Sequence, residues 1–196
     1  GQESAKRAVW YGIVGMGLAV LATLIGPGAG LWWLSAVLIA AGGLIGYQLA
    51  SKVEMTQMPE LVAGMHALVG LAAVFVGFNA HFELGNVMAM DEAAKKTLDG
   101  FAALLAKKSG VEINILRVEA SLGIWIGAVT FTGSVIAYGK LAGKVTSAAT
   151  KLPGGHALNA SAALASVICL IWYLNSGGLL PLLILTLMAL FIGYHL

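Results

Sequence analysis

A single histidine lies deep inside an apolar stretch of the sequence. His66 stands in the run Pro59 to Ala80, and small residues follow or precede it three, four, seven and eleven positions away, at Ala63, Gly70, Ala73 and Gly77. These positions share one face of a helix, so we expect the imidazole to point at a neighbouring helix and not at lipid. An ionisable side chain well inside a membrane span is costly and is a functional candidate by default. Histidine gains and loses a proton near neutral pH, which makes proton carriage the chemistry to consider. The alternative is a neutral ring satisfied by an interhelical hydrogen bond.

A second polar pattern lies in the run Leu116 to Gly139. Small or polar residues recur there at spacings of four, four, three and four: Glu119, Gly123, Gly127, Thr130 and Ser134. At 3.6 residues per turn they share one helix face. Two interpretations stay open. The face is either a tight helix contact, with Gly70, Gly77, Gly123 and Gly127 letting backbones approach, or the wall of a polar conduit with Glu119 near its outer mouth.

Other chemistry finds little support in the sequence. No histidine pair has metal-ligand spacing, and Cys169 is the one cysteine. The glycines between Gly12 and Gly17 have the wrong order of spacings for a dinucleotide turn, and no strand precedes them. We therefore predict no catalytic, cofactor-binding or metal site in this chain. His81 and His195 are expected at a membrane interface or in a loop.

The composition requires lipid as the solvent for these elements. Hydrophobic residues make up 59% of the chain and charged residues 10%, whereas soluble domains carry about 25% charged residues. The net charge of +2 is too small to indicate nucleic-acid binding. Apolar runs near the length of a membrane span cover residues 9–25, 31–50, 59–80, 116–139, 156–174 and 179–195. We predict an all-α integral membrane protein, a bundle of about six transmembrane helices in a single domain covering residues 1–196.

Basic residues indicate the orientation of the bundle. With six spans, one side of the membrane receives Lys6, Arg7, Lys52, Lys140, Lys144 and Lys151. By the positive-inside rule both ends of the chain are then cytoplasmic. The one long connection, residues 83–115, lies on the opposite side. Acidic Asp91 and Glu92 at its start and Lys107 and Lys108 near its end predict a short amphipathic surface helix within it.

Two segments carry a family resemblance. Residues Val53 to Asn79 read VEMTQMPELVAGMHALVGLAAVFVGFN, and residues Arg117 to Lys144 read RVEASLGIWIGAVTFTGSVIAYGKLAGK. Both closely resemble the membrane domain of the β subunit of proton-translocating NAD(P) transhydrogenase, and the resemblance covers nearly all of the chain in order. His66 matches the membrane histidine of that family, Glu119 the acidic residue at the start of the following span, and Ser134 the hydroxyl of the FTGS motif.

The resemblance implies a function for the complete enzyme. In that family, hydride transfer from NADH to NADP⁺ occurs in separate soluble domains and is coupled to inward proton movement through the membrane domain. The implied partners are membrane lipid, the alpha subunit and the soluble NAD(H)- and NADP(H)-binding domains, in a dimer of the enzyme in the inner (plasma) membrane. Further helices and an NADP(H)-binding domain are expected outside this stretch. The chain alone is thus expected to bind no nucleotide and to catalyse no reaction.

Two other classes of function remain open on the sequence. A transporter or channel for another ion or small solute predicts helices broken in mid-span around a binding site. A structural membrane anchor predicts tolerance to the loss of His66 and Glu119.

Overall fold

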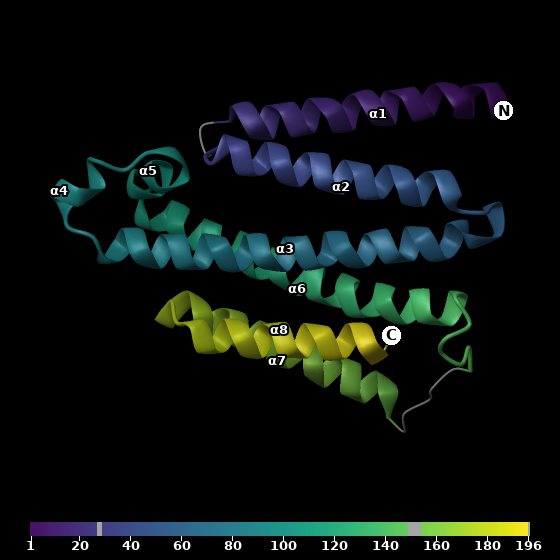
Figure 1. Ribbon diagram of the computed structural model, residues 1–196. Coiled ribbons are helices and arrows are strands. Elements are labelled where there is room, and N and C mark those ends of the chain that lie inside the picture. Colours follow the sequence, from purple (N-terminus) through teal and green to yellow (C-terminus); the bar gives the residue numbers. More distant parts are fainter. Residues whose placement is uncertain (27–28, 149–153, 196) are drawn as a thin grey trace. The chain divides into compact units, whose positions relative to one another are not determined.

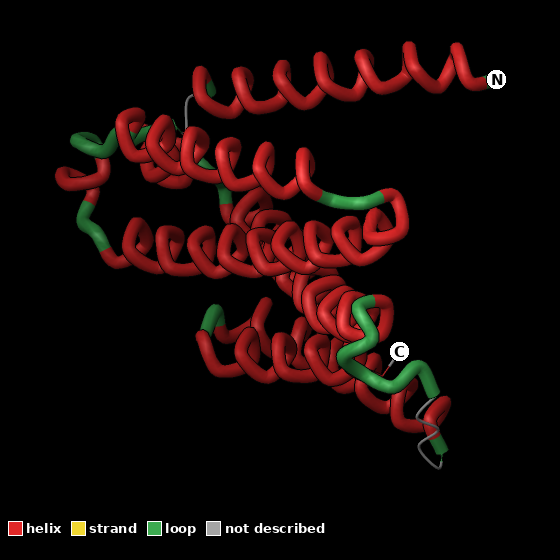
Figure 2. The backbone as a smooth tube through the Cα atoms, turned by 45° about the vertical axis from the view of Figure 1, so that its right-hand side comes forward, coloured by secondary structure: helices red, strands yellow, loops and turns green. Residues whose placement is uncertain are grey.

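The computed structural model describes residues 1–26, 29–148 and 154–195, and these residues contain helices and no strand. Five long helices in this part of the chain are long and apolar enough to cross a membrane: α1 (Gln2–Ile25), α2 (Trp32–Lys52), α3 (Met58–Ala89), α6 (Gly110–Leu141) and α7 (Gly155–Ser176) (Figure 1). A sixth apolar helix, α8 (Leu179–His195), has 17 residues. The predicted all-α, multi-pass membrane protein is confirmed. Figure 2 shows how little of the described chain lies outside helices.

The long helices extend beyond several of the predicted apolar runs. Helix α1 begins at Gln2, so the polar residues before Val9 are part of it. Glu3 lies in the first turn, where a negative charge interacts favourably with the helix dipole. Helices α3 and α6 contain 32 residues each. At a rise of 1.5 Å per residue each is about 48 Å long. The boundaries near residues 50, 156, 174, 179 and 195 agree with the helices to within about two residues.

The long connection differs from the prediction. Because α3 continues to Ala89 and α6 begins at Gly110, it is much shorter than residues 83–115, and two short helices replace the single one expected. They are α4 (Glu92–Lys95) and α5 (Gly100–Ala106). The Asp91 carboxylate caps α4 by accepting the Ala94 N–H at 2.7 Å. The chain leaves that helix after one turn and starts α5 at Gly100, whose φ of +58° is a conformation that glycine adopts readily.

The chain forms two compact units. The first consists of residues Gly1–Leu49 and Val87–Lys107, and the second of Ala50–Asn86 and Lys108–Leu196. In the first unit, α1 and α2 contain no buried residue. The second unit holds most of α3 with α6, α7 and α8, and it contains every candidate site residue. The predicted orientation remains a prediction, and Lys151, one of the residues on which it depends, lies outside the described residues.

The core of the second unit lies where α6 packs against the hairpin of α7 and α8. Its buried residues are Val74, Ile124, Ala128, Cys169, Tyr173, Leu182, Leu185 and Ala189. The hairpin turns at Gly177, whose φ is +62° and whose N–H donates to the Tyr173 carbonyl at 2.7 Å. On α8, Gly193 contacts the backbone of Val129 and the side chain of Thr132 on α6. A side chain at that position would push the two helices apart.

Candidate functional site

Helices α3 and α6 meet at glycines. A Cβ atom added at Gly70 would lie 2.7 Å from the Gly127 carbonyl oxygen, and one added at Gly127 would lie 2.6 Å from the Gly70 carbonyl oxygen. Further along, Gly77 packs against Ile124. Small residues thus let the two backbones touch, as interhelical contacts in membranes require. Gly123 lies away from this contact, since a Cβ atom there would meet nothing within 4 Å.

The same contacts fix the register of the two helices. Gly64 lies beside Tyr138, Gly70 beside Gly127, and Gly77 beside Ile124, so residue numbers rise along α3 as they fall along α6. The helices are therefore antiparallel. His66 and Ser134 both lie between the first two of these contacts, at the same depth. Glu119 is fifteen residues before Ser134, about 22 Å further along the axis.

The His66 ring is exposed and bonds to its own helix. Its side chain is exposed in this unit, and its Nδ1 donates to the Val62 carbonyl one turn earlier, at 2.8 Å. The expected contact with a neighbouring helix is therefore not present among the described residues of this unit. A carbonyl oxygen can only accept, so Nδ1 carries the hydrogen. In the neutral ring, Nε2 then has a free lone pair that can take up a proton.

Two hydroxyl groups on α6 remain available for such chemistry. Thr130 and Ser134 are half-buried, and neither forms a hydrogen bond within the part of the chain that the structure describes. Thr130 lies against Gly70. By contrast, Ser121 donates to the Arg117 carbonyl at 2.7 Å. The Thr130 and Ser134 hydroxyls can therefore bind water, since their own helix does not use them.

Two further polar side chains of α6, those of Thr132 and Glu119, have different surroundings. Thr132 Oγ1 lies 3.0 Å from the Ala128 carbonyl and 2.9 Å from the Leu190 carbonyl, so it joins α6 to α8. Glu119 is exposed and forms no ion pair with a described residue. The register places Thr130, Ser134 and His66 near one another along the helix pair and Glu119 toward one end.

A polar cluster that the sequence did not reveal lies near that end. The Nδ1 atom of His81 on α3 and the hydroxyl of Tyr173 on α7 form a hydrogen bond of 2.9 Å, whose direction depends on the tautomer of the ring. Tyr173 is 1% exposed. On α6, Arg117 donates from Nη1 to the carbonyl of Leu174, the residue after Tyr173, at 3.4 Å. His81 was expected at the membrane interface, whereas its ring joins α3 to the inside of the bundle.

A signal for this cluster exists in the sequence. His81, itself half-buried, continues the line of buried α3 positions Gly70, Val74 and Gly77, with spacings of four, three and four. Tyr173 lies inside an apolar run, where a tyrosine hydroxyl normally finds a hydrogen-bond partner. Neither feature names the partner, since the two residues are 92 positions apart.

His195 also differs from its expected place in a loop or at an interface. It forms a hydrogen bond from Nδ1 to the Asn159 side-chain oxygen at 2.9 Å, and its ring stacks on Phe191. The bond joins the end of α8 to the start of α7.

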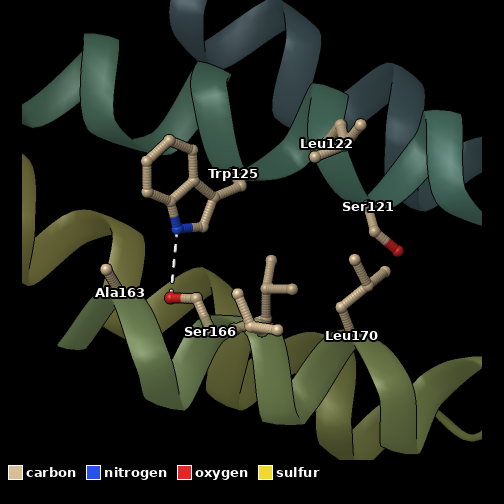
Figure 3. Close-up of a pocket in the computed structure, with 8 residues that line it drawn as sticks. Ser121, Leu122, Trp125, Ala163, Ser166 and Leu170 are labelled. Carbon is tan, nitrogen blue, oxygen red and sulfur yellow. Dashed lines mark hydrogen bonds between the residues drawn. The ribbon is translucent and has the colours of Figure 1, made fainter. Parts of the chain in front are cut away.

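A pocket of about 250 Å³ lies between α6 and α7 and is lined almost entirely by apolar atoms. Figure 3 shows Trp125 pointing across it, where Nε1 donates to the Ser166 hydroxyl at 3.1 Å. Ser166 in turn donates to the Ala162 carbonyl at 2.8 Å. The pocket is lined by no titratable side chain, so it offers no site for proton carriage.

The glycines of α1 do not form a dinucleotide-binding turn. A dinucleotide site needs a glycine-rich turn between a strand and a helix, but Gly12, Gly15 and Gly17 lie within α1. No group of three His, Cys, Asp or Glu side chains gathers in the described part as a metal site would require.

Comparison with known proteins gives one consistent family. The sequence model described as "NAD(P) transhydrogenase beta subunit" matches residues 1–196. A curated protein named "NAD(P) transhydrogenase subunit beta", from Rhodospirillum rubrum, is 38% identical over 154 residues, which are 79% of this chain and 30% of the relative. A protein of the same name from a defined strain of that organism matches to the same extent. The chain therefore spans 30% of the length of the curated relatives that it matches.

Proposed function

The chain belongs to the NAD(P) transhydrogenase beta subunit family, and from this premise we propose that it forms a proton-conducting part of the enzyme's membrane domain. In the complete enzyme, inward proton translocation through this part is coupled to hydride transfer from NADH to NADP⁺. We place the hydride step in separate soluble domains that bind NAD(H) and NADP(H).

The observation that carries the proposal is the pair of α6 hydroxyls that bond to no described residue and lie near the depth of His66 along the helix pair. Thr130 and Ser134 make no hydrogen bond in the described part of the chain, and the antiparallel register puts Ser134 at the depth of His66. A hydroxyl both donates and accepts, so with water it can relay a proton along α6. In this mechanism a proton enters near Glu119, passes Thr130 and Ser134, and binds His66 at Nε2.

Coupling needs a link between His66 and the nucleotide domains. One elementary charge that crosses 100 mV releases about 2.3 kcal/mol, which shifts an equilibrium by more than tenfold. That energy is useful only if protonation of His66 changes which nucleotide state the soluble domains favour. The partners proposed for this step are the alpha subunit and the NADP(H)-binding domain, within a dimer of the enzyme.

The proposed setting is the inner (plasma) membrane, with both ends of this chain on the cytoplasmic side. The bias of Lys and Arg supports this orientation. A transporter for another solute is less favoured, because α3 and α6 run unbroken through their whole length where such a site would interrupt them.

The test uses the complete enzyme reconstituted in liposomes that contain a pH-sensitive dye. We expect proton movement only while NADH and NADP⁺ both turn over, and none when either nucleotide is omitted. Turnover without proton movement would exclude a conducting role. Proton movement that ignores the nucleotides would identify an uncoupled channel instead.

A further inference from the structure

Three helices of the second unit bring polar side chains together at one place in its interior. His81 comes from α3, Arg117 from α6 and Tyr173 from α7. The ring of His81 and the ring of Tyr173 lie 5.5 Å apart between centroids, and the 2.9 Å hydrogen bond joins Nδ1 to the hydroxyl. An interhelical bond between a titratable ring and an almost fully buried hydroxyl is unlike every other histidine contact in the described chain.

Arg117 lies at the end of α7 near this pair. Its guanidinium donates to the Leu174 carbonyl at the end of α7, where a positive charge favours the helix dipole. It also covers Gly177, at which a Cβ atom would lie 2.8 Å from Nη2. Its Nε is buried and has no hydrogen-bond partner among the described residues. The guanidinium therefore lies at the end of α7, next to the residue that follows Tyr173.

The register of α3 and α6 gives the depth of the pair. Gly77 packs against Ile124 and the Ala120 carbonyl. His81 lies one turn beyond Gly77, which puts it level with the turn of α6 that contains Arg117 and Glu119. Glu119 is two residues from Arg117 and faces the other side of the helix. Glu119 and His81 therefore lie at the same depth in the bundle, but Glu119 is on the side of α6 opposite to Arg117.

We propose that His81 is a second proton-carrying residue, at the Glu119 end of the bundle, and that Tyr173 positions its ring. The inference rests on the proposed function, since it adds a station to the same proton route. His66 and His81 are fifteen residues apart on α3, about 22 Å along the helix axis. That distance is too long for a direct transfer between the two rings, so water and the α6 hydroxyls connect them.

The proton step at His81 balances with water alone. In the tautomer whose Nδ1 donates to the Tyr173 oxygen, Nε2 of the neutral ring has a free lone pair and no partner in the described residues. A hydronium ion gives its proton to Nε2, which leaves water and an imidazolium. The same proton then passes from Nε2 to a second water deeper in the path, and the ring is neutral again. Tyr173 keeps its own proton throughout.

The experiment compares three variants of the complete enzyme in liposomes. His81→Gln keeps a side chain that can bond the Tyr173 hydroxyl but cannot carry a proton. Tyr173→Phe removes the hydroxyl and keeps the buried ring. Trp125→Phe is the matched control, because it removes another interhelical hydrogen bond, to Ser166, without a titratable group. The readouts are the transhydrogenation rate with and without an imposed proton gradient, its solvent deuterium isotope effect, and the thermal stability of the protein.

We expect His81→Gln to lose most of the gradient-driven increase in rate and to change the isotope effect. Tyr173→Phe should lose part of that increase, because the variant lacks the hydroxyl that holds the His81 ring. Trp125→Phe should lower thermal stability and keep the increase. An unimpaired increase in assembled His81→Gln overturns the inference, and so does an equal loss in Trp125→Phe.

Two further outcomes are separable. If His81→Gln does not assemble, Tyr173→Phe decides, and a full gradient response in that variant counts against the inference. If the unmodified enzyme moves no protons during turnover, the proposed function itself fails. If it moves protons and His81→Gln does so equally well, only the role of His81 fails.

Discussion

Gly70 and Gly127 each face the other's backbone, so that an alanine Cβ at either position would fall within 2.7 Å of the partner's carbonyl oxygen. No side chain separates α3 from α6 at this point. Lipid tails are as apolar as the helices themselves, so close backbone packing of this kind is a main source of helix association in a membrane. The contact also sets the register on which the depths of His66 and Ser134 depend.

The Gly127→Ala variant should therefore destabilise the bundle. Its methyl group forces α3 and α6 apart, at a cost of about 1–3 kcal/mol typical of overpacking. The matched control is Gly123→Ala, one turn away on the same helix, where a Cβ atom meets nothing within 4 Å. That change should be neutral or stabilising by up to about 1 kcal/mol through helix propensity. Thermal unfolding in detergent compares the two, and equal midpoints would contradict the packing described.

His66→Gln should remove most proton-coupled transhydrogenation from the complete enzyme. The loss expected for a missing proton-transfer group is about 10²-fold or more. Assembly should survive, because the ring is exposed in this unit and bonds only to its own helix. The measurement is the gradient-driven rate in liposomes, with detergent stability as its control. Normal proton movement in the variant would remove His66 from the route.

Ser134→Ala should slow proton-coupled turnover less than the loss of His66 does. Water can replace a missing hydroxyl in a relay, whereas nothing replaces the ring. Ser121→Ala is the matched control on the same helix, since the Ser121 hydroxyl donates to the Arg117 carbonyl and lies on the α7 side. It should leave the rate unchanged. Equal effects of the two serine variants would speak against a path along the α3 side of α6.

Gly193→Ala should weaken the contact between α6 and α8. The added methyl group would collide with the Val129 carbonyl and displace the Thr132 side chain, which bonds to the Leu190 carbonyl. A loss of about 1–3 kcal/mol is expected. Gly85→Ala, at a position with nothing within 4 Å, serves as its control. Thermal midpoints measured in one detergent distinguish them, and a stable Gly193→Ala variant would refute the close approach.

Helix type and the glycine contact follow from the sequence because they depend on composition and spacing. A continuous apolar run must form a helix in lipid, and glycines at spacings of three and four share a face. The exact ends do not follow, because polar residues after Ala80 and before Leu116 can extend a helix into water once the apolar part has formed. The Ser109–Glu112 capping box, with Glu112 accepting the Ser109 N–H at 2.8 Å, marks the true start of α6.

The periodicity of the sequence could not predict the direction of the His66 ring. Four residues on a helix turn through roughly 400°, so His66 and Gly70 differ by about 40° around the axis. Gly70 is at the centre of the α3–α6 contact, and that offset leaves His66 at its edge, where the ring bonds to Val62 instead. His81 continues the line of buried positions on α3, but its partner can be recognised only when α7 is known to pack beside α3. Only tertiary structure supplies that neighbour.

Helices α3 and α6, with 32 residues each, are longer than the hydrocarbon layer of a membrane is thick. A helix about 48 Å long exceeds a hydrocarbon layer of about 30 Å by roughly 18 Å, and tilts observed in membranes absorb only part of this excess length. The ends of the pair must then stand among the lipid headgroups. Thicker or thinner bilayers change how much of each end is submerged. The lipid chains of the host membrane thereby help to set how far Glu119 and His81 are from bulk water.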